Sequence, residues 1–327
     1  MENEAETIKM ARVAKENIHN ELSKVIVGQK EVIDQILLCL FTGSHCLLTG
    51  VPGLAKTLLV SSIAKVLHLE FNRIQFTSDL MPADITGLEI LEESQDGHRY
   101  MKFVKGPIFA NVILADEINR TPPKTQSALL EAMQEHQVTA AGQSYKLPEP
   151  FFVLATQNPI EMEGTYPLPE AQLDRFMFNI FIDFPSIEDE VDIVTQTTSK
   201  KPIHPEALYG AGDIQAFCDL SMKMPVAPEV VKYAVDLAVQ SRPDSKGLDF
   251  INEFVNFGAG IRGGQHLIKG AKARALLNGQ NHVSVDDVVA VTHPVLRHRI
   301  GLSYRAEAQK MNVENVIDKL LDSVKKP

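Results

Sequence analysis

The chain has 327 residues, 44% of them hydrophobic, and a formal net charge of −10. This length suits one large or two medium domains, and the negative charge argues against broad electrostatic binding of nucleic acid or anionic lipid. No apolar run approaches the ~20 residues needed to span a bilayer. The acidic start Met1–Glu6 lacks the basic and apolar regions of a signal peptide, so we expect a cytoplasmic location. Cys39, Cys46 and Cys218 have no metal or redox spacing and are expected to be reduced.

The first part of the chain has the pattern of an α/β domain. An amphipathic helix is predicted over residues 5–24, with its apolar positions facing inward at Ile8, Ala11, Ile18 and Leu22, and a second helix over 31–41. Apolar strands are predicted at 45–49, 71–76, 111–115, 151–155 and 178–184. Helical stretches lie between several of these strands, and this alternation predicts a mostly parallel sheet covered by helices on both faces.

Two β-hairpins are predicted within this pattern, at 88–104 and 137–147. Asp96-Gly97 and Ala141-Gly142 supply their turns. These hairpins either have a function of their own or only extend the edge of the sheet.

The last part of the chain is predicted to be helical. Ser186 and Asp189 form a capping-box pattern that opens a helix. Further helices are predicted at 213–223, 228–241, 262–278, 284–291 and 313–325. We therefore expect an α/β core with the N-terminal helix and both hairpins over residues 1–198, and a helical domain over 199–327.

The most informative stretch is Gly50-Val51-Pro52-Gly53-Leu54-Ala55-Lys56-Thr57, which lies between a predicted strand and a predicted helix. A strand, a glycine-rich turn, a lysine, a hydroxyl and a helix form the phosphate-binding loop arrangement. Its backbone N–H groups would converge on phosphate oxygens, Lys56 would reach the β- and γ-phosphates, and Thr57 would bind Mg²⁺. Ala55 stands where the motif expects glycine. The alternative is a glycine-rich turn with an incidental lysine.

A second motif follows the apolar strand that ends at Ala115. Asp116 would orient Mg²⁺, and Glu117 would polarise the attacking water. A water-activating carboxylate suits a nucleotide hydrolase and has no use in a kinase. The alternative is a strand end with two solvated acids.

Three further residues are candidates for sensing or stabilising the γ-phosphate. Asn158 follows the strand at 151–155, and its amide would hydrogen-bond the γ-phosphate or the water. Arg175 could enter a neighbouring subunit's site as an arginine finger, or be only a salt-bridged helix end. Arg262 opens a long helix and could touch the γ-phosphate from above.

Taken together, these motifs resemble the MoxR family of AAA+ ATPases over nearly the whole chain. Ala55 before Lys56 is usual in that family. The other stretches that carry the resemblance are Leu114 to Arg120, Pro122 to Glu135, Ala155 to Pro159 and Gly164 to Phe176. The resemblance implies an AAA+ phosphate-loop core with a parallel sheet between helices, followed by a smaller all-α lid domain. The hairpins are similar to inserts of the wider clade that includes magnesium chelatase.

The resemblance also implies roles for individual residues. Asn158 takes the sensor-1 role, Arg175 the trans arginine finger and Arg262 the sensor-2 role, although Gly260-Ile261-Arg262-Gly263 differs from the common Ser-Pro-Arg. Arg120 is another candidate for a role between subunits. The nucleotide-binding set is completed by the residues that flank the loop and precede the second helix: Leu58, Val27, Gly28 and Gln29.

By resemblance, the expected function is Mg²⁺-dependent ATP hydrolysis by a ring, hexameric by this expectation, that remodels client proteins or metalloenzymes. A von Willebrand factor A-type protein is the expected partner. The alternative is a nucleic-acid-stimulated motor or initiator of the same fold. That alternative would need a basic pore or a DNA-binding module, for which Lys102 and Lys105 are a thin basis.

Overall fold

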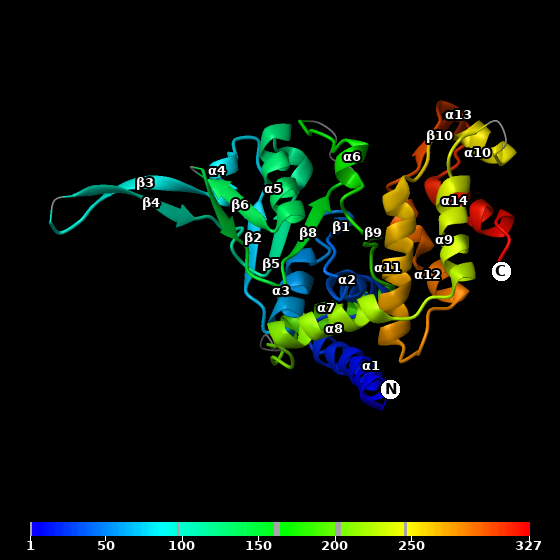
Figure 1. The fold of residues 1–327 in the computed structure, drawn as a ribbon, viewed down its shortest axis with the longest axis horizontal. Coiled ribbons are helices and arrows are strands. Elements are labelled where there is room, and N and C mark those ends of the chain that lie inside the picture. Colours follow the sequence, from blue (N-terminus) through cyan, green and yellow to red (C-terminus); the bar gives the residue numbers. More distant parts are fainter. Residues whose placement is uncertain (1, 97, 141, 160–163, 200–203, 245–246) are drawn as a thin grey trace.

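The structure is a computed structural model that describes residues 2–96, 98–140, 142–159, 164–199, 204–244 and 247–327 (Figure 1). The predicted turn residues Gly97 and Ala141 lie outside the described residues.

Five parallel strands form the central sheet, in the spatial order β2-β5-β8-β1-β9. They are β1 (Cys46–Thr49), β2 (Phe71–Gln75), β5 (Val112–Asp116), β8 (Phe152–Gln157) and β9 (Phe178–Phe181). The predicted parallel sheet is confirmed. Strand β9 ends three residues earlier than predicted because its neighbour β1 ends at Thr49, opposite Phe181.

Helices accompany this sheet along the first 199 residues. They are α1 (Glu2–Leu22), α2 (Lys30–Leu40), α3 (Lys56–Val66), α4 (Pro82–Thr86), the 3-10 helix η1 (Ile118–Arg120), α5 (Pro123–Glu135), α6 (Glu170–Leu173) and α7 (Ile187–Ser199). The four predicted inward positions of α1 are all buried. Ser186 Oγ accepts a hydrogen bond from Asp189 N at 3.1 Å, so the predicted cap opens α7.

The two hairpins form separate two-stranded sheets and do not extend the central one. They are β3 (Gly87–Glu93) with β4 (Arg99–Lys105), and β6 (Gln137–Ala140) with β7 (Gln143–Lys146). The β3–β4 hairpin extends far out from the body of the molecule (Figure 1). The rings of Phe103 and Tyr145 stack with centroids 4.1 Å apart, which joins the bases of the two hairpins.

The rest of the chain is helical, as predicted, apart from one small sheet. Its elements are α8 (Ala211–Lys223), α9 (Pro228–Gln240), α10 (Asp249–Phe254), α11 (Ile261–Leu277), α12 (Val285–Leu296), α13 (Tyr304–Ala308), α14 (Val313–Ser323), and the strands β10 (Val255–Phe257) and β11 (Gly301–Leu302). The two strands were missed because runs of two or three residues are too short to show alternation. Helix α12 runs five residues beyond its predicted end and contains Pro294.

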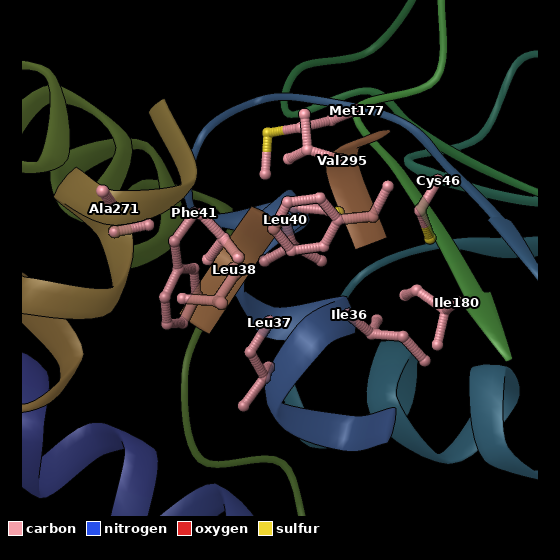
Figure 2. Close-up of a cluster of buried hydrophobic side chains, with 14 of the residues drawn as sticks. Ile36, Leu37, Leu38, Leu40, Phe41, Cys46, Met177, Ile180, Ala271 and Val295 are labelled. Atoms are coloured by element: carbon pink, nitrogen blue, oxygen red, sulfur yellow. The ribbon is translucent and has the colours of Figure 1, made fainter. Parts of the chain in front are cut away.

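A continuous apolar cluster joins one face of the sheet to the helical region. Figure 2 shows Leu40 of α2 and the next residue, Phe41, close to Met177, Ala271 of α11 and Val295 of α12. A second cluster on the other face packs α5 against β5 and β8. The first cluster holds the helical region against the sheet, and so determines which end of the strands each of its helices adjoins. Within the described residues, no helix combines the length and the apolar character needed to cross a membrane.

Candidate active site

The predicted phosphate-binding loop connects β1 to α3, and α3 begins at Lys56. Gly50 must be glycine, because a Cβ there would lie 2.5 Å from the Ile182 carbonyl oxygen. Gly53 has a φ of 88° and Ala55 a φ of 52°. The left-handed conformation costs an alanine about 1–2 kcal/mol, which explains why the motif expects glycine at this position. Ala55 nevertheless keeps the turn that aims the first N–H groups of α3 at the loop.

Lys56 is partly buried at the start of α3, where its ammonium group donates a hydrogen bond to the Gly50 carbonyl. Burial lowers the pKa of Lys56, and the nearby carboxylates of Asp116 and Glu117 oppose that shift. Lys56 therefore lies close enough to Asp116 and Glu117 for their charges to interact. The structure thus brings the two sequence motifs together at the carboxyl ends of β1 and β5.

Thr156 of β8 holds the two acids in place. Its hydroxyl donates to Asp116 Oδ1 at 2.7 Å and accepts from the Glu117 backbone N–H at 2.8 Å. Glu117 has a φ of 58°, a conformation that costs a non-glycine residue of order 1–3 kcal/mol. The strain is concentrated at the residue expected to activate water, and Thr156 is one of the contacts that maintain it.

Two polar residues of β2 contact the acids and were missed in the sequence. Arg73 Nη2 lies 2.7 Å from Asp116 Oδ2, and Gln75 Nε2 donates to Glu117 Oε2 at 3.0 Å. Arg73 also donates to Gln75. The spacing predicts only that Arg73 and Gln75 share one face of β2, because residues two apart on a strand point to the same face; it does not predict which strand lies beside β2.

Arg120 follows Glu117 by three residues, and its Nε lies 3.3 Å from Glu117 Oε2. Arg120, the other candidate for a role between subunits, therefore contacts Glu117 of its own subunit in this structure.

Asn158 is buried directly after β8, beside the start of the loop. The Gly50 N–H donates to the carbonyl of Gln157 at 3.3 Å, so the residue after Gln157 lies next to the phosphate-binding loop. The role of Asn158 as a sensor of the γ-phosphate stays a prediction.

The segment Val27–Gln29 precedes α2 and contacts the first turn of α7. Gly28 has a φ of 66°, and a Cβ built on it would lie 2.9 Å from Asp189 Oδ2. Gln29, Ser186 and Asp189 line one hollow with a volume of about 470 Å³. The contribution of Val27, Gly28 and Gln29 to nucleotide binding stays a prediction.

Arg175 and Arg262 lie together at the opposite ends of the strands from the loop. The Met177 N–H, two residues after Arg175, donates to the carbonyl of His45, the residue before β1. Arg175 Nη1 donates to the Leu130 carbonyl at 2.8 Å. Burial and the positive charge of Arg262 lower the pKa of Arg175.

Arg262 Nη1 lies 3.6 Å from Asp174 Oδ2, adjacent in sequence to Arg175. The expectation that Arg262 touches the γ-phosphate from above its own core does not match this placement. The reason is that α11 packs beside the amino end of β9, whereas the loop follows the carboxyl end of β1. Neither arginine faces the phosphate-binding loop of its own subunit.

A buried arginine, Arg299, fixes this region and was also missed in the sequence. Its guanidinium donates to Asp174 Oδ1 at 2.8 Å and to the carbonyls of Phe176 and Met177 at 2.7 and 3.1 Å. Burial lowers the pKa of Arg299 to about 10, which leaves it charged at neutral pH. Arg299 therefore ties the helical region to the segment that carries Arg175.

The donor set fits a nucleoside triphosphate with Mg²⁺. The Thr57 hydroxyl and the Asp116 carboxylate are hard oxygen donors of the kind Mg²⁺ prefers. Lys56 and the amino end of the 11-residue helix α3 supply positive potential for phosphate oxygens. Both sets lie at the same edge of the sheet, which is where ligands bind in open α/β folds.

Comparisons with known proteins show which family of proteins the chain is similar to. Residues 45–178 match the model for the ATPase family associated with various cellular activities (AAA), and residues 251–320 match the AAA lid domain. The chain is 42% identical to chaperone MoxR1 of Mycobacterium tuberculosis over 94% of this chain and 81% of that protein. It is 30% identical to protein MoxR of Paracoccus denitrificans over 92% of each. A solved structure of an ATPase candidate from Cytophaga hutchinsonii is 40% identical, covers 98% of this chain and 97% of its own, and superposes with a TM-score of 0.90.

Proposed function

Because the chain belongs to the MoxR family of AAA ATPases and is an ATPase, we propose that it hydrolyses ATP with Mg²⁺ inside a closed ring of its own copies and remodels client proteins. The observation that carries this proposal is the separation of two half-sites on one chain. The phosphate-binding loop follows the carboxyl end of β1, whereas Arg175 and Arg262 lie at the amino ends of the strands.

Two different half-sites on one chain require a head-to-tail contact between copies, which closes into a ring when the rotation permits. Arg175 and Arg262 of one copy then face the phosphate-binding loop of the next. A hexamer is the ring size proposed. The division into a core over 1–198 and a lid over 199–327 is part of the same proposal.

Each residue of the composite site has one task in this proposal. Lys56 and the loop N–H groups hold the phosphates, Thr57 and Asp116 hold Mg²⁺, and Asn158 orients the γ-phosphate or the water. Glu117 accepts the proton of the attacking water. Arg175 from the next copy stabilises the negative charge that develops in the transition state. When bound, Mg²⁺ would neutralise part of the negative charge of the phosphates.

The client role rests on the name of one relative and on the hairpins. A relative over most of both chains is named a chaperone, and the β3–β4 hairpin exposes large apolar side chains, among them Leu91 and Met101. We propose that the hairpins contact a protein client or a von Willebrand factor A-type partner, in the cytoplasm. The net charge of −10 argues against nucleic acid as the partner.

Mixing two inactive variants tests the composite site. Glu117→Gln is expected to bind ATP but lose hydrolysis on the order of 10²-fold, because the amide cannot accept the water's proton. Arg175→Ala is expected to bind ATP and hydrolyse it slowly. In an equimolar mixture, about one quarter of the interfaces pair an intact Glu117 with an intact Arg175, and phosphate release should recover accordingly.

The matched control is Arg12→Ala, which removes an exposed arginine on α1 and should keep the wild-type rate. Absence of any recovery on mixing would show that Arg175 acts only within its own subunit. Measuring the same rates with single-stranded and duplex DNA separates the alternative function, since strong stimulation by DNA would favour a nucleic-acid motor.

A further inference from the structure

Helix α7 presents an apolar stripe that no described residue of its own chain covers. Ile187, Val191 and Val194 are 78%, 59% and 60% exposed. With about 100° of rotation per residue, these three positions fall within an arc of about 60°. They form one continuous apolar face on a helix that has no fully buried residue.

The side of α7 that faces its own core is the opposite one. Asp189, Ile193 and Gln196 are the partly buried positions of the helix, and the same rotation places their centre about 160° from the centre of the exposed stripe. The stripe therefore points directly away from the core. An exposed apolar stripe of this kind marks an interaction site.

A groove between α9 and α11 has the complementary character. Val231, Val235 and Val239 recur every fourth residue along α9 and are 39–46% exposed, and Ile261 of α11 is 79% exposed. Together with Ile268 they line an apolar hollow of about 620 Å³. A helix with side chains at i, i+4 and i+7 is the usual occupant of such a groove.

The charges around the two surfaces are of opposite sign. Helix α7 has four acidic residues and no lysine or arginine: Glu188, Asp189, Glu190 and Asp192. Helix α11 has four basic residues and no aspartate or glutamate: Arg262, Lys269, Lys272 and Arg274. Arg274 forms an ion pair with Asp287 of α12, and Lys272 donates to the Met222 carbonyl on α8, so these two are engaged away from the groove. Arg242 and Lys269 lie at the groove itself. Opposite potentials of this kind orient two partners and suppress wrong pairings.

Both surfaces also lie where a composite nucleotide site would bring two copies together. The groove is lined by Gly260 and Ile261, which directly precede Arg262. Helix α7 begins beside the segment that precedes α2, through the contact of Asp189 with Gly28. The groove thus adjoins the arginines, and α7 adjoins the nucleotide-binding half of the chain.

We infer that α7 of one copy of this chain docks in the α9–α11 groove of the next copy, with its apolar stripe in the groove and Glu188 and Glu190, which flank the stripe, against Arg242 and Lys269. This inference rests on the proposed ring and names the surfaces that hold it together. The contact is heterologous, since each copy contributes a different surface.

Two substitutions disrupt the two surfaces of this contact, the α7 stripe and the α9–α11 groove, separately. Val191→Glu places a carboxylate on the stripe, and Val235→Glu places one in the groove. Because burying an unpaired charge is costly, each variant should raise the protein concentration needed for assembly by at least about tenfold. Assembly is measured by sedimentation velocity with Mg²⁺ and a non-hydrolysable ATP analogue.

A mixture of the two variants gives the sharper result. The intact α7 of the Val235→Glu chain can still dock in the intact groove of the Val191→Glu chain. The remaining α7 and the remaining groove of that pair are both broken, so growth stops. An equimolar mixture should therefore form dimers and nothing larger, while each variant alone stays monomeric.

The matched control is Val13→Glu on α1, where the valine is 43% exposed, and it should assemble like the wild type. Circular dichroism and binding of the analogue check that each variant is folded. Wild-type assembly by either variant, or a mixture that stays monomeric, overturns the α7–groove contact while leaving a ring built on other surfaces. A wild-type chain that stays monomeric with the analogue refutes the ring itself, and the contact with it.

Discussion

Arg299 and Asp174 form an ion pair across the junction of the helical region and the core, with Arg299 Nε 2.8 Å from Asp174 Oδ1. The other oxygen of the same carboxylate lies 3.6 Å from Arg262 Nη1. Asp174 therefore holds one arginine from the end of α12 and one from the start of α11, directly beside Arg175. This carboxylate therefore links the helical region to the segment that carries the proposed arginine finger.

Arg299→Ala should lower the free energy of unfolding by about 3–5 kcal/mol, because it leaves a partly buried carboxylate and several carbonyls without their partner. Urea denaturation followed by circular dichroism measures the change. The matched control is Arg305→Ala, which removes an exposed arginine paired with Glu253 and should cost less than about 1 kcal/mol. Equal losses in the two variants would show that the buried network adds no stability.

Lys56→Ala should abolish tight, Mg²⁺-dependent ATP binding, because the phosphates lose their main charge partner in the loop. Calorimetric titration with the ATP analogue measures the affinity. Lys65→Ala, near the end of the same helix and exposed, should bind as the wild type does. Tight binding by Lys56→Ala would place the nucleotide elsewhere.

Folding stability should fall as the pH drops from about 6.5 towards 4, in part through His45. Burial lowers the pKa of His45 to about 4, and its Nδ1 accepts a hydrogen bond from the Val153 N–H at 3.0 Å. The unfolded chain has an ordinary histidine pKa of about 6.5 and so binds a proton that the folded chain excludes. The free energy of unfolding contributed by His45 is complete above pH 6.5 and decreases by up to about 1.4 kcal/mol per pH unit below it.

Urea denaturation at pH 7.5 and 5.5 measures this dependence. His45→Gln should reduce the difference between the two pH values, whereas His68→Gln, at an exposed position, should leave it unchanged. An identical difference in all three proteins would assign the pH dependence to other groups.

The parallel sheet and the loop could be predicted because their signals are local. Apolar runs of four to six residues, a glycine-rich turn and a lysine–hydroxyl pair follow one another within a short window around Lys56. Thr156 and Gln75 could not be assigned to the acids in advance. Their contacts depend on the order in which β2, β5 and β8 lie side by side, which the sequence pattern leaves open.

The placement of Arg262 needed the structure for a similar reason. Its position at the start of a helix was predicted correctly, but a helix boundary does not say which end of the sheet the helix adjoins. The packing of α11 and α12 against β9 and α2 decides that, through residues such as Ala271 and Val295 (Figure 2). Long-range packing therefore turned an expected contact within one subunit into a proposed contact between subunits.

The β3–β4 hairpin should be needed for client capture and not for basal ATP hydrolysis. Leu91 and Met101 pair across its strands and are 61% and 56% exposed, while the hairpin forms a sheet separate from the one that carries the loop. Replacing both with serine removes apolar surface without changing the turn. In an ATP-dependent pull-down, we expect the double variant made in Glu117→Gln to lose the proteins that the Glu117→Gln parent recovers. Made in the wild-type chain, the same two substitutions should leave the basal ATPase rate unchanged.

Met222→Ser on α8 is the matched control, since Met222 is 62% exposed on another face of the chain, and it should recover the same proteins as the parent. Equal recovery by the hairpin variant would remove Leu91 and Met101 from client binding. Recovery of DNA in place of protein by the parent would favour the nucleic-acid motor, because the hairpin would then act on a strand and not on a polypeptide. The stacked rings of Phe103 and Tyr145 join the two hairpins. Tyr145→Ser removes this contact at the base and leaves the tip of the β3–β4 hairpin intact. It should therefore reduce client capture, but by less than the double variant at Leu91 and Met101.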